Sequence, residues 1–190
     1  MANGLPDIRF GIKEVADVKF YEITGEDADG VKHGETPVLV LDTLKVSNIE
    51  STAEQTEARG GKGNAPLIIW DYGREITLTL EDALLSLETL ALMFEGDVAN
   101  ADKVITVNAN TFPGTYYVEG TTYARNEIDG KDHLFTFTIP KAKVNSEVTL
   151  TMEAEGDPTV FSMSLRVLRD KKGNMMTLTR AETAIDANTP

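Results

Sequence analysis

The sequence predicts a mainly β protein, a sandwich or barrel of antiparallel strands with one flanking α-helix. Most of the 190 residues alternate between apolar and polar side chains with period two, as in half-buried strands. Short clusters of Gly, Asp and Asn separate these runs and predict turns. One segment, residues 82–95, instead has apolar side chains at helical spacing. The length favours a single domain, which we expect over residues 14–180.

The first half of the chain contains five predicted strands. Each is a short run with alternating or continuous apolar residues, and residues 25–30 form a turn rich in Gly and Asp after the first of them. The five predicted strands are residues 18–23, 38–41, 44–49, 67–70 and 75–80.

A long polar segment, about residues 48–66, separates the third strand from the fourth. It contains the run Gly60-Gly61-Lys62-Gly63-Asn64 and shows no clear apolar periodicity, so we expect a long loop. Loops of this length without secondary structure are usually functional or mobile. This segment is therefore the first place to look for function.

Residues 82–95 form the predicted helix. Asp82 is a plausible N-cap, and Gly96 follows the last periodic residue at the position where a helix commonly stops. The apolar residues that share the predicted buried face are Leu84, Leu87, Ala91 and Phe94.

Strand patterns resume in the second half of the chain. Residues 126–130 and 170–174 are predicted turns, the second of them a tight hairpin connection. Residues 1–13 and 181–190 are polar and are expected to be extended terminal arms. The predicted strands are residues 103–107, 115–119, 121–125, 133–139, 148–152, 160–168 and 175–179.

Charge and composition exclude several classes of protein. The 31 acidic and 18 basic residues give a net charge of −13, which argues against tight nucleic-acid binding because that requires clustered Lys and Arg. An acidic surface still permits DNA to slide past without adhering. The chain has no cysteine, so disulfides, thiol catalysis and Cys-ligated metals are excluded. No run is apolar enough for a membrane-spanning helix.

The sequence shows no catalytic or metal-binding pattern. His33 and His133 lie far apart, and neither has a ligand partner at suitable spacing. The glycine run does not match a phosphate-binding loop, because Thr56 replaces the first glycine and Gly63 replaces the hydroxyl residue. We therefore expect no enzymatic activity, no cofactor and no metal.

Five aromatic residues could stack on sugar rings, as in a carbohydrate-binding β-sandwich. Aromatic residues in strands more often fill cores and cross-strand pairs, so we expect a core role for them. They are Trp70, Phe112, Tyr116, Tyr117 and Tyr123.

Residues 44–80, LKVSNIESTAEQTEARGGKGNAPLIIWDYGREITLTL, carry a resemblance to a known family. Together with the single helix between two sets of strands and the polar termini, this passage resembles the tail tube proteins of tailed bacteriophages. It is similar to the loop-and-strand region of major tail proteins in phages of Gram-positive hosts.

The resemblance implies a structural virion protein that self-assembles. Subunits of such tubes form stacked hexameric rings around an inner β-barrel, through which DNA passes without specific binding. The loop at residues 48–66 and the terminal arms would contact neighbouring subunits. A loop of mixed charge is too polar to fold alone, yet it can become ordered against a partner. The loop residues expected to make these contacts are Glu50, Glu54, Glu57, Arg59, Gly60, Gly61, Lys62 and Asn64.

The resemblance also implies partners and a location. The partners would be further copies of the chain and other tail proteins, namely the tape measure, the tail terminator and the baseplate or tail tip. Assembly would occur in the cytoplasm of the bacterial host, without a membrane, and the product would lie in the virion tail.

Other readings stay open from the residues alone. The chain could be another virion β-domain, at the tail end, in the baseplate or decorating the capsid, or part of a related injection device. A carbohydrate-binding sandwich would use Trp70 and the tyrosines. A glycoside hydrolase would have to use the scattered carboxylates Asp71, Glu75, Glu81 and Asp82.

Overall fold

A computed structural model describes residues 9–95, 97–99, 104–127, 130–145 and 161–184. It confirms a mainly β protein of antiparallel strands with one helix. The elements are β1 (Phe10–Asp27), β2 (Gly30–His33), β3 (Leu39–Leu41), β4 (Leu44–Gly60), β5 (Ala65–Asp82), α1 (Leu87–Phe94), β6 (Asp97–Ala99), β7 (Val104–Thr106), β8 (Thr115–Asn126), β9 (Asp132–Val144), β10 (Phe161–Val167) and β11 (Thr177–Ala184).

Nine of these strands form one folded sheet in the order β2-β1-β8-β9-β10-β5-β4. β3 lies beside β1 and β11 beside β9, while β6 and β7 form a separate two-stranded sheet. β9 pairs with β11 through residues 133–138 and with β10 through residues 142–144, so its two halves connect different parts of the sheet. Within the described residues the sheet ends at β2 and β4 and is open, rather than closed into a barrel.

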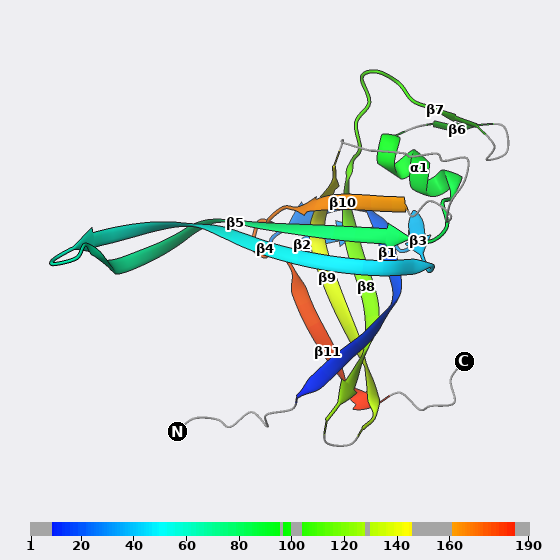
Figure 1. The fold of residues 1–190 in the computed structure, drawn as a ribbon. Helices are drawn as coiled ribbons and strands as arrows, with labels where there is room; N and C mark the ends of the chain where they lie inside the picture. Colours follow the sequence, from blue (N-terminus) through cyan, green and yellow to red (C-terminus); the bar gives the residue numbers. More distant parts are fainter. Residues whose placement is uncertain (1–8, 96, 100–103, 128–129, 146–160, 185–190) are drawn as a thin grey trace, which may run out of the picture.

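The folded sheet forms two layers that enclose the core. β10, β5 and β4 run across the direction of β1, β8, β9 and β11 (Figure 1). Alternating residues of β5 and β10, such as Leu78 and Leu165, are fully buried between the layers. Phe20 on β1 and Ile139 on β9 fill the same core from the other layer. The period-two pattern therefore identified the buried faces of these strands correctly.

The helix is shorter than predicted and buries a different face. It spans Leu87–Phe94, and Ser86, not Asp82, is its N-cap. Asp82 ends β5 as a buried residue that accepts hydrogen bonds from the Thr43 hydroxyl and the Leu84 backbone N–H (3.4 Å). The predicted stop at Gly96 lies outside the described residues. The buried helix residues are Thr89, Leu92 and Met93, and Leu84 of the predicted face is 68% exposed.

The predicted long loop is wrong. Residues 48–60 continue β4, residues 65 and 66 already belong to β5, and only Gly61–Asn64 form the turn between them. The paired strands project from the rest of the molecule as one long hairpin (Figure 1). The sequence of β4 did not predict a strand here because both faces of this part of β4 are exposed. Polar side chains therefore occupy successive positions, and the usual alternation of apolar and polar residues is missing.

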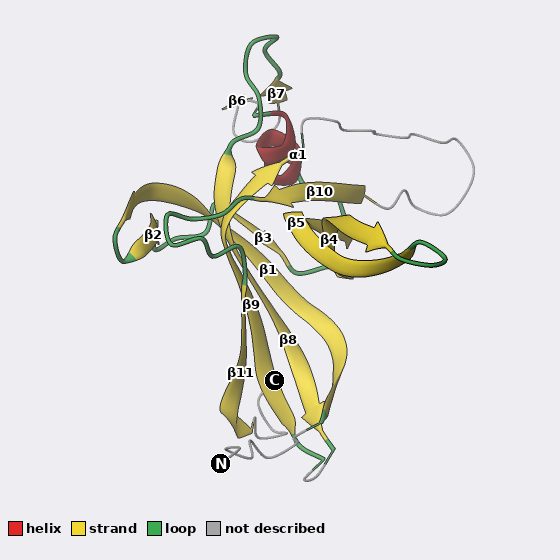
Figure 2. Ribbon diagram, turned by 90° about the vertical axis from the view of Figure 1, so that its left-hand side faces the viewer, coloured by secondary structure: helices red, strands yellow, loops and turns green. Residues whose placement is uncertain are grey.

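Several other boundaries also differ from expectation. The two strands predicted at residues 115–119 and 121–125 are one strand, β8, and the predicted strand at 148–152 lies outside the described residues. Residues 170–174 form a tight turn, but it joins β10 and β11, which both pair with β9 (Figure 2). Strand structure also includes residues 10–13 and 181–184 of the expected terminal arms.

Candidate functional site

The projecting part of the hairpin, residues 50–75, is the most unusual surface of the molecule. We call it the arm. All its residues are exposed except Ala58 and Gly60, which are half-buried. The boundary with the core is abrupt, because the Glu75 side chain is 56% exposed whereas Ile76 is 5% exposed. A two-stranded ribbon has little buried surface of its own and is marginally stable in isolation.

The β5 strand of the arm exposes large apolar side chains on both of its faces. Leu67, Ile68, Ile69 and Trp70 are consecutive and are 67%, 53%, 51% and 50% exposed. Successive residues of a strand point to opposite faces, so neither face of the arm is purely polar. Contiguous exposed apolar residues of this kind are typical of an interaction surface.

The β4 strand of the arm is polar and lies opposite this apolar strand. Glu54 pairs with Tyr72, Thr56 with Trp70, and Glu57 with Ile69 across the ladder. The Gln55 side-chain amide donates to Asp71 (2.7 Å), which ties the two strands together. The arm therefore combines one charged strand with one apolar strand.

The predicted contact residues all lie on the arm, in β4 or in the turn. Glu50, Glu54 and Glu57 line the polar strand, and Arg59 forms an ion pair with Glu57 (2.5 Å). Gly61 and Asn64 have positive φ values of 75° and 51°, which the tight turn requires. The structure spreads these residues along one strand and its turn and does not gather them into one cluster; they are Glu50, Glu54, Glu57, Arg59, Gly60, Gly61, Lys62 and Asn64.

Sequence reasoning missed the apolar strand of the arm as a functional surface. Residues 67–70 were expected to form an ordinary strand, with Trp70 in the core. The available signal was their lack of alternation, since four consecutive large apolar residues suit a strand covered on both faces. In this chain no other described element covers either face, as their exposure shows.

A second apolar surface lies at the other end of the sheet. Phe10 and Ile12 on β1 and Leu178 on β11 are about half exposed. The ring of Phe10 lies 5.7 Å from that of Phe135, and the Arg180 guanidinium lies 6.0 Å from the centre of the Phe10 ring. The contacts of Phe10 with Phe135 and Arg180 bring β1, β9 and β11 together here, and we call the exposed side chains of Phe10, Ile12 and Leu178 the ridge.

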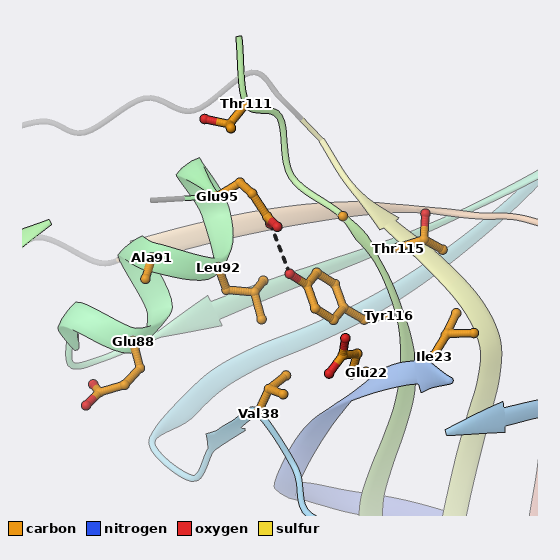
Figure 3. Close-up of a pocket in the computed structure, with 11 residues that line it drawn as sticks. Glu22, Ile23, Val38, Glu88, Ala91, Leu92, Glu95, Thr111, Thr115 and Tyr116 are labelled. Atoms are coloured by element: carbon orange, nitrogen blue, oxygen red, sulfur yellow. Dashed lines mark hydrogen bonds between the residues drawn. The ribbon is translucent and has the colours of Figure 1, made fainter. Parts of the chain in front are cut away.

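A cleft of about 700 Å³ lies between α1 and the ends of β1, β3 and β8 (Figure 3). Its lining includes the apolar side chains of Ile23, Val38 and Leu92. The Tyr116 hydroxyl donates to Glu95 Oε2 across the cleft (3.2 Å). Burial, followed by the neighbouring Glu95 charge, raises the pKa of Tyr116 to about 12.

The aromatic residues do not form a common sugar platform. Trp70 lies on the arm and Phe112 is 66% exposed, so the expected core role is wrong for both. Tyr116 lies against Phe20 with a centroid distance of 6.4 Å, whereas Tyr117 stacks on His33 at 3.9 Å on the opposite face of β8.

The described part of the chain offers neither a metal-binding cluster nor a membrane-spanning helix. Those residues contain no cluster of three or more His, Cys, Asp or Glu arranged to hold a metal ion. None of the helices in the same part of the chain is long and apolar enough to cross a membrane.

Taken together, the open β-sheet, the arm and the ridge define a β-protein that exposes apolar side chains suited to association with a partner. Comparison with family models gives the particular family. The chain belongs to the YomU/Tube protein family, whose model matches residues 10–101 and 97–178. This membership supports the resemblance to phage tail tube proteins and identifies a structural component of a virion tail. No curated protein matches the chain.

Proposed function

We propose that this protein self-assembles into stacked hexameric rings that form the tail tube, the conduit for DNA ejection. The arm is the observation that carries this proposal. Residues 67–70 expose apolar side chains on both faces of a ribbon, and burial against another copy would remove that surface from water. The predicted contact residues from Glu50 to Asn64 lie on the same arm and provide its charged rim.

The edges of the sheet support lateral contacts within a ring. Unpaired strand edges readily pair with another chain, and a closed ring of subunits satisfies them. β4 and β2 form the two ends of the described sheet, and the ridge of Phe10, Ile12 and Leu178 offers further apolar surface. The terminal residues 1–13 and 181–190 would add contacts between subunits.

The charge of the protein fits a passage for DNA. A subunit with a net charge of −13 repels phosphate, so DNA would pass through the lumen without specific binding. The role is structural rather than enzymatic. Its partners would be further copies and the tape measure, terminator and baseplate or tip proteins, assembled in the host cytoplasm.

Electron microscopy of the purified protein across a concentration series tests this function. We expect stacked rings or hollow tubes from the wild-type chain. In the arm variant, an Asn-Gly turn replaces residues 53–74 and joins Thr52 to Glu75, which face each other in the ladder. It should fold, because the removed residues lie outside the core, and it should form no tubes.

A double substitution on the arm provides a milder variant. Ile69→Ser with Trp70→Ser removes one exposed apolar side chain from each face, and Thr52→Ser with Thr56→Ser is the control on the facing strand. Normal tubes from both the shortened and the serine variants would exclude the arm as a tube contact. Closed oligomers that never elongate would favour a tail-end, baseplate or capsid-decoration role.

A further inference from the structure

The cleft beside α1 has the chemistry of a receptor for an apolar, cationic guest. Ile23, Val38 and Leu92 supply apolar contact, and the Tyr116 ring lies among them (Figure 3). Among the described residues, the charged side chains that line the cleft are three carboxylates, Glu22, Glu88 and Glu95, with no Lys or Arg.

The outer end of the arm has the complementary chemistry. We call residues 58–70 the arm tip. It contains Arg59 and Lys62 and no acidic side chain, so it is a cationic element in a strongly acidic protein. The same thirteen residues include the exposed run from Leu67 to Trp70. The charge of Arg59 is partly offset by its ion pair with Glu57. Lys62 lies beyond the end of β4, in the turn, and is therefore the outermost cation of the arm tip.

The positions of the two surfaces prevent them from meeting within one chain. Figure 1 shows the arm tip and α1 at opposite sides of the molecule. An element that projects from one side and a receptor on the other side give a heterologous contact, in which every copy both donates and receives. Such contacts close into rings or continue as a filament.

We propose that the cleft between α1 and β1, β3 and β8 receives the arm tip of a second copy of this chain. The inference rests on the proposed self-assembly and adds the receiving surface to it. One face of the run from Leu67 to Trp70 would cover the apolar side chains of Ile23, Val38 and Leu92. Lys62 would lie near Glu88 and Glu95, and the attraction between opposite charges would favour binding of the arm by its tip. The same carboxylates would repel the inner part of the arm, which is acidic.

Disulfide trapping tests this contact directly, because the chain has no cysteine of its own. The test variant is Lys62→Cys with Glu88→Cys in the full-length protein. Mild oxidation should give a ladder of covalent multimers on a non-reducing gel, since each copy carries one donor and one receiver cysteine. Each single-cysteine variant should stay monomeric, apart from a minor dimer.

A charge-reversal pair provides a second test that does not require disulfide geometry. Lys62→Glu or Glu88→Lys alone should raise the critical concentration for assembly about five- to tenfold, since an attraction becomes a repulsion. The combination should restore assembly to near the wild-type concentration. The matched control is Glu127→Lys, an exposed acidic residue at the far end of β8, which should not restore assembly of the Lys62→Glu variant.

The outcomes separate this inference from the proposed function. Tubes that form without cross-linking and without rescue by charge reversal would overturn the cleft as the receiver and leave the tube function standing. A disulfide ladder in a protein that never elongates would support the cleft and count against the tube. Dispersed monomers with neither cross-links nor assembly would overturn both.

Discussion

Phe137 on β9 occupies the space where a side chain at Gly120 on β8 would lie. The two residues face each other directly in the ladder, and a Cβ at Gly120 would come within 2.1 Å of the Phe137 ring. Phe137 is 5% exposed, so its ring covers the bare backbone of β8 and closes this part of the core. Gly120 does not have the positive φ that often selects glycine, so its backbone conformation does not require glycine. The lack of space for a side chain does.

We therefore expect Gly120→Ala to destabilise the fold. The ring of Phe137 would have to move out of its buried position, and overpacking of this kind costs about 1–3 kcal/mol. Urea denaturation followed by circular dichroism measures the change in the free energy of unfolding. Gly11→Ala is the control, since a Cβ there meets nothing within 4 Å. Equal stabilities of the two variants would contradict the packing argument.

Ser86→Ala should destabilise the single helix. The Ser86 hydroxyl oxygen accepts a hydrogen bond from the Thr89 backbone N–H (3.0 Å), which satisfies one of the free donors at the helix start. Loss of an N-cap typically costs about 1 kcal/mol. Ser86→Asn keeps an N-capping side chain and should stay near wild type in the same denaturation experiment. If the alanine variant matches the asparagine variant, the cap contributes nothing.

Tyr116→Phe should make the protein less sensitive to alkali. The folded-state pKa of Tyr116 is about 12 against 10.0 for a free tyrosine, because burial and the Glu95 charge disfavour the phenolate. The unfolded chain releases this proton first, so the associated stability is complete below pH 10 and is lost as the pH rises toward 12.

The measurement compares wild type with Tyr116→Phe. In each protein, the free energy of unfolding is determined at about pH 9 and about pH 11, and the difference is the loss caused by alkali. The loss should be smaller in Tyr116→Phe, and Tyr72→Phe, at an exposed position on the arm, serves as the matched control. Identical losses in wild type and Tyr116→Phe would refute the assignment.

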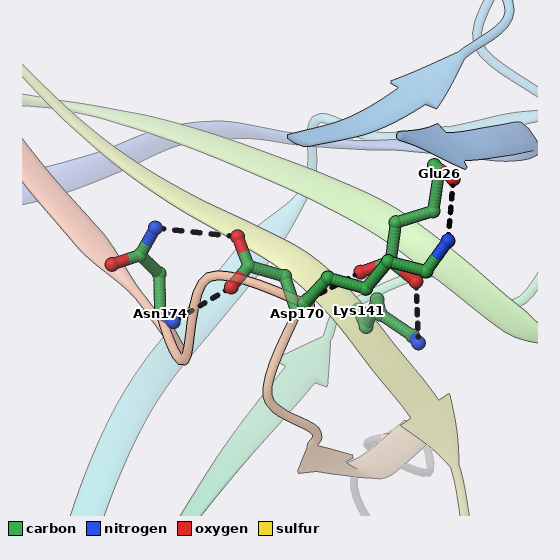
Figure 4. Close-up of polar contacts among 5 residues, drawn as sticks. Glu26, Lys141, Asp170 and Asn174 are labelled. Atoms are coloured by element: carbon green, nitrogen blue, oxygen red, sulfur yellow. Dashed lines mark hydrogen bonds and ion pairs between the residues drawn. The ribbon is translucent and has the colours of Figure 1, made fainter. Parts of the chain in front are cut away.

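Glu26→Gln should weaken the fold near neutral pH and much less in acid. Glu26 Oε1 accepts the Lys171 backbone N–H (2.6 Å), and Oε2 accepts from Lys141 Nζ (3.2 Å) (Figure 4). The Lys171 hydrogen bond, followed by that of Lys141, lowers the pKa of Glu26 below 4.5. Its stabilisation is therefore present above that value and is lost as the pH falls through the lowered folded-state pKa.

Denaturation at about pH 7 and about pH 3 tests the sign of this effect. The difference between wild type and Glu26→Gln should shrink at the lower pH, and the exposed Glu35→Gln variant is the control. A difference that stays constant with pH would show that the carboxylate charge of Glu26 is not involved.

Most strands could be predicted because they are half-buried. In β10 and in the inner half of β5 one face lies in the core, so alternation in sequence reports alternation in burial. The arm could not be predicted as a hairpin because both of its faces are exposed within one chain. The polar β4 half was interpreted as a loop, although the eight residues expected to make contacts all lie on this projecting element.

The sequence by itself determined the β class, the single helix and the acidic charge, because these depend on composition and local periodicity. The family resemblance came instead from the passage at residues 44–80. Only the tertiary structure decided which strands pair, since β10 and β11 follow each other in sequence yet both pair with β9. It also decided that Leu67 to Trp70 are exposed and that Ser86 begins the helix. A local run of apolar residues can predict that these side chains are buried. Whether they are buried depends on elements distant in sequence, which a local pattern does not include. For the arm, the element that we propose buries them belongs to another copy of the chain.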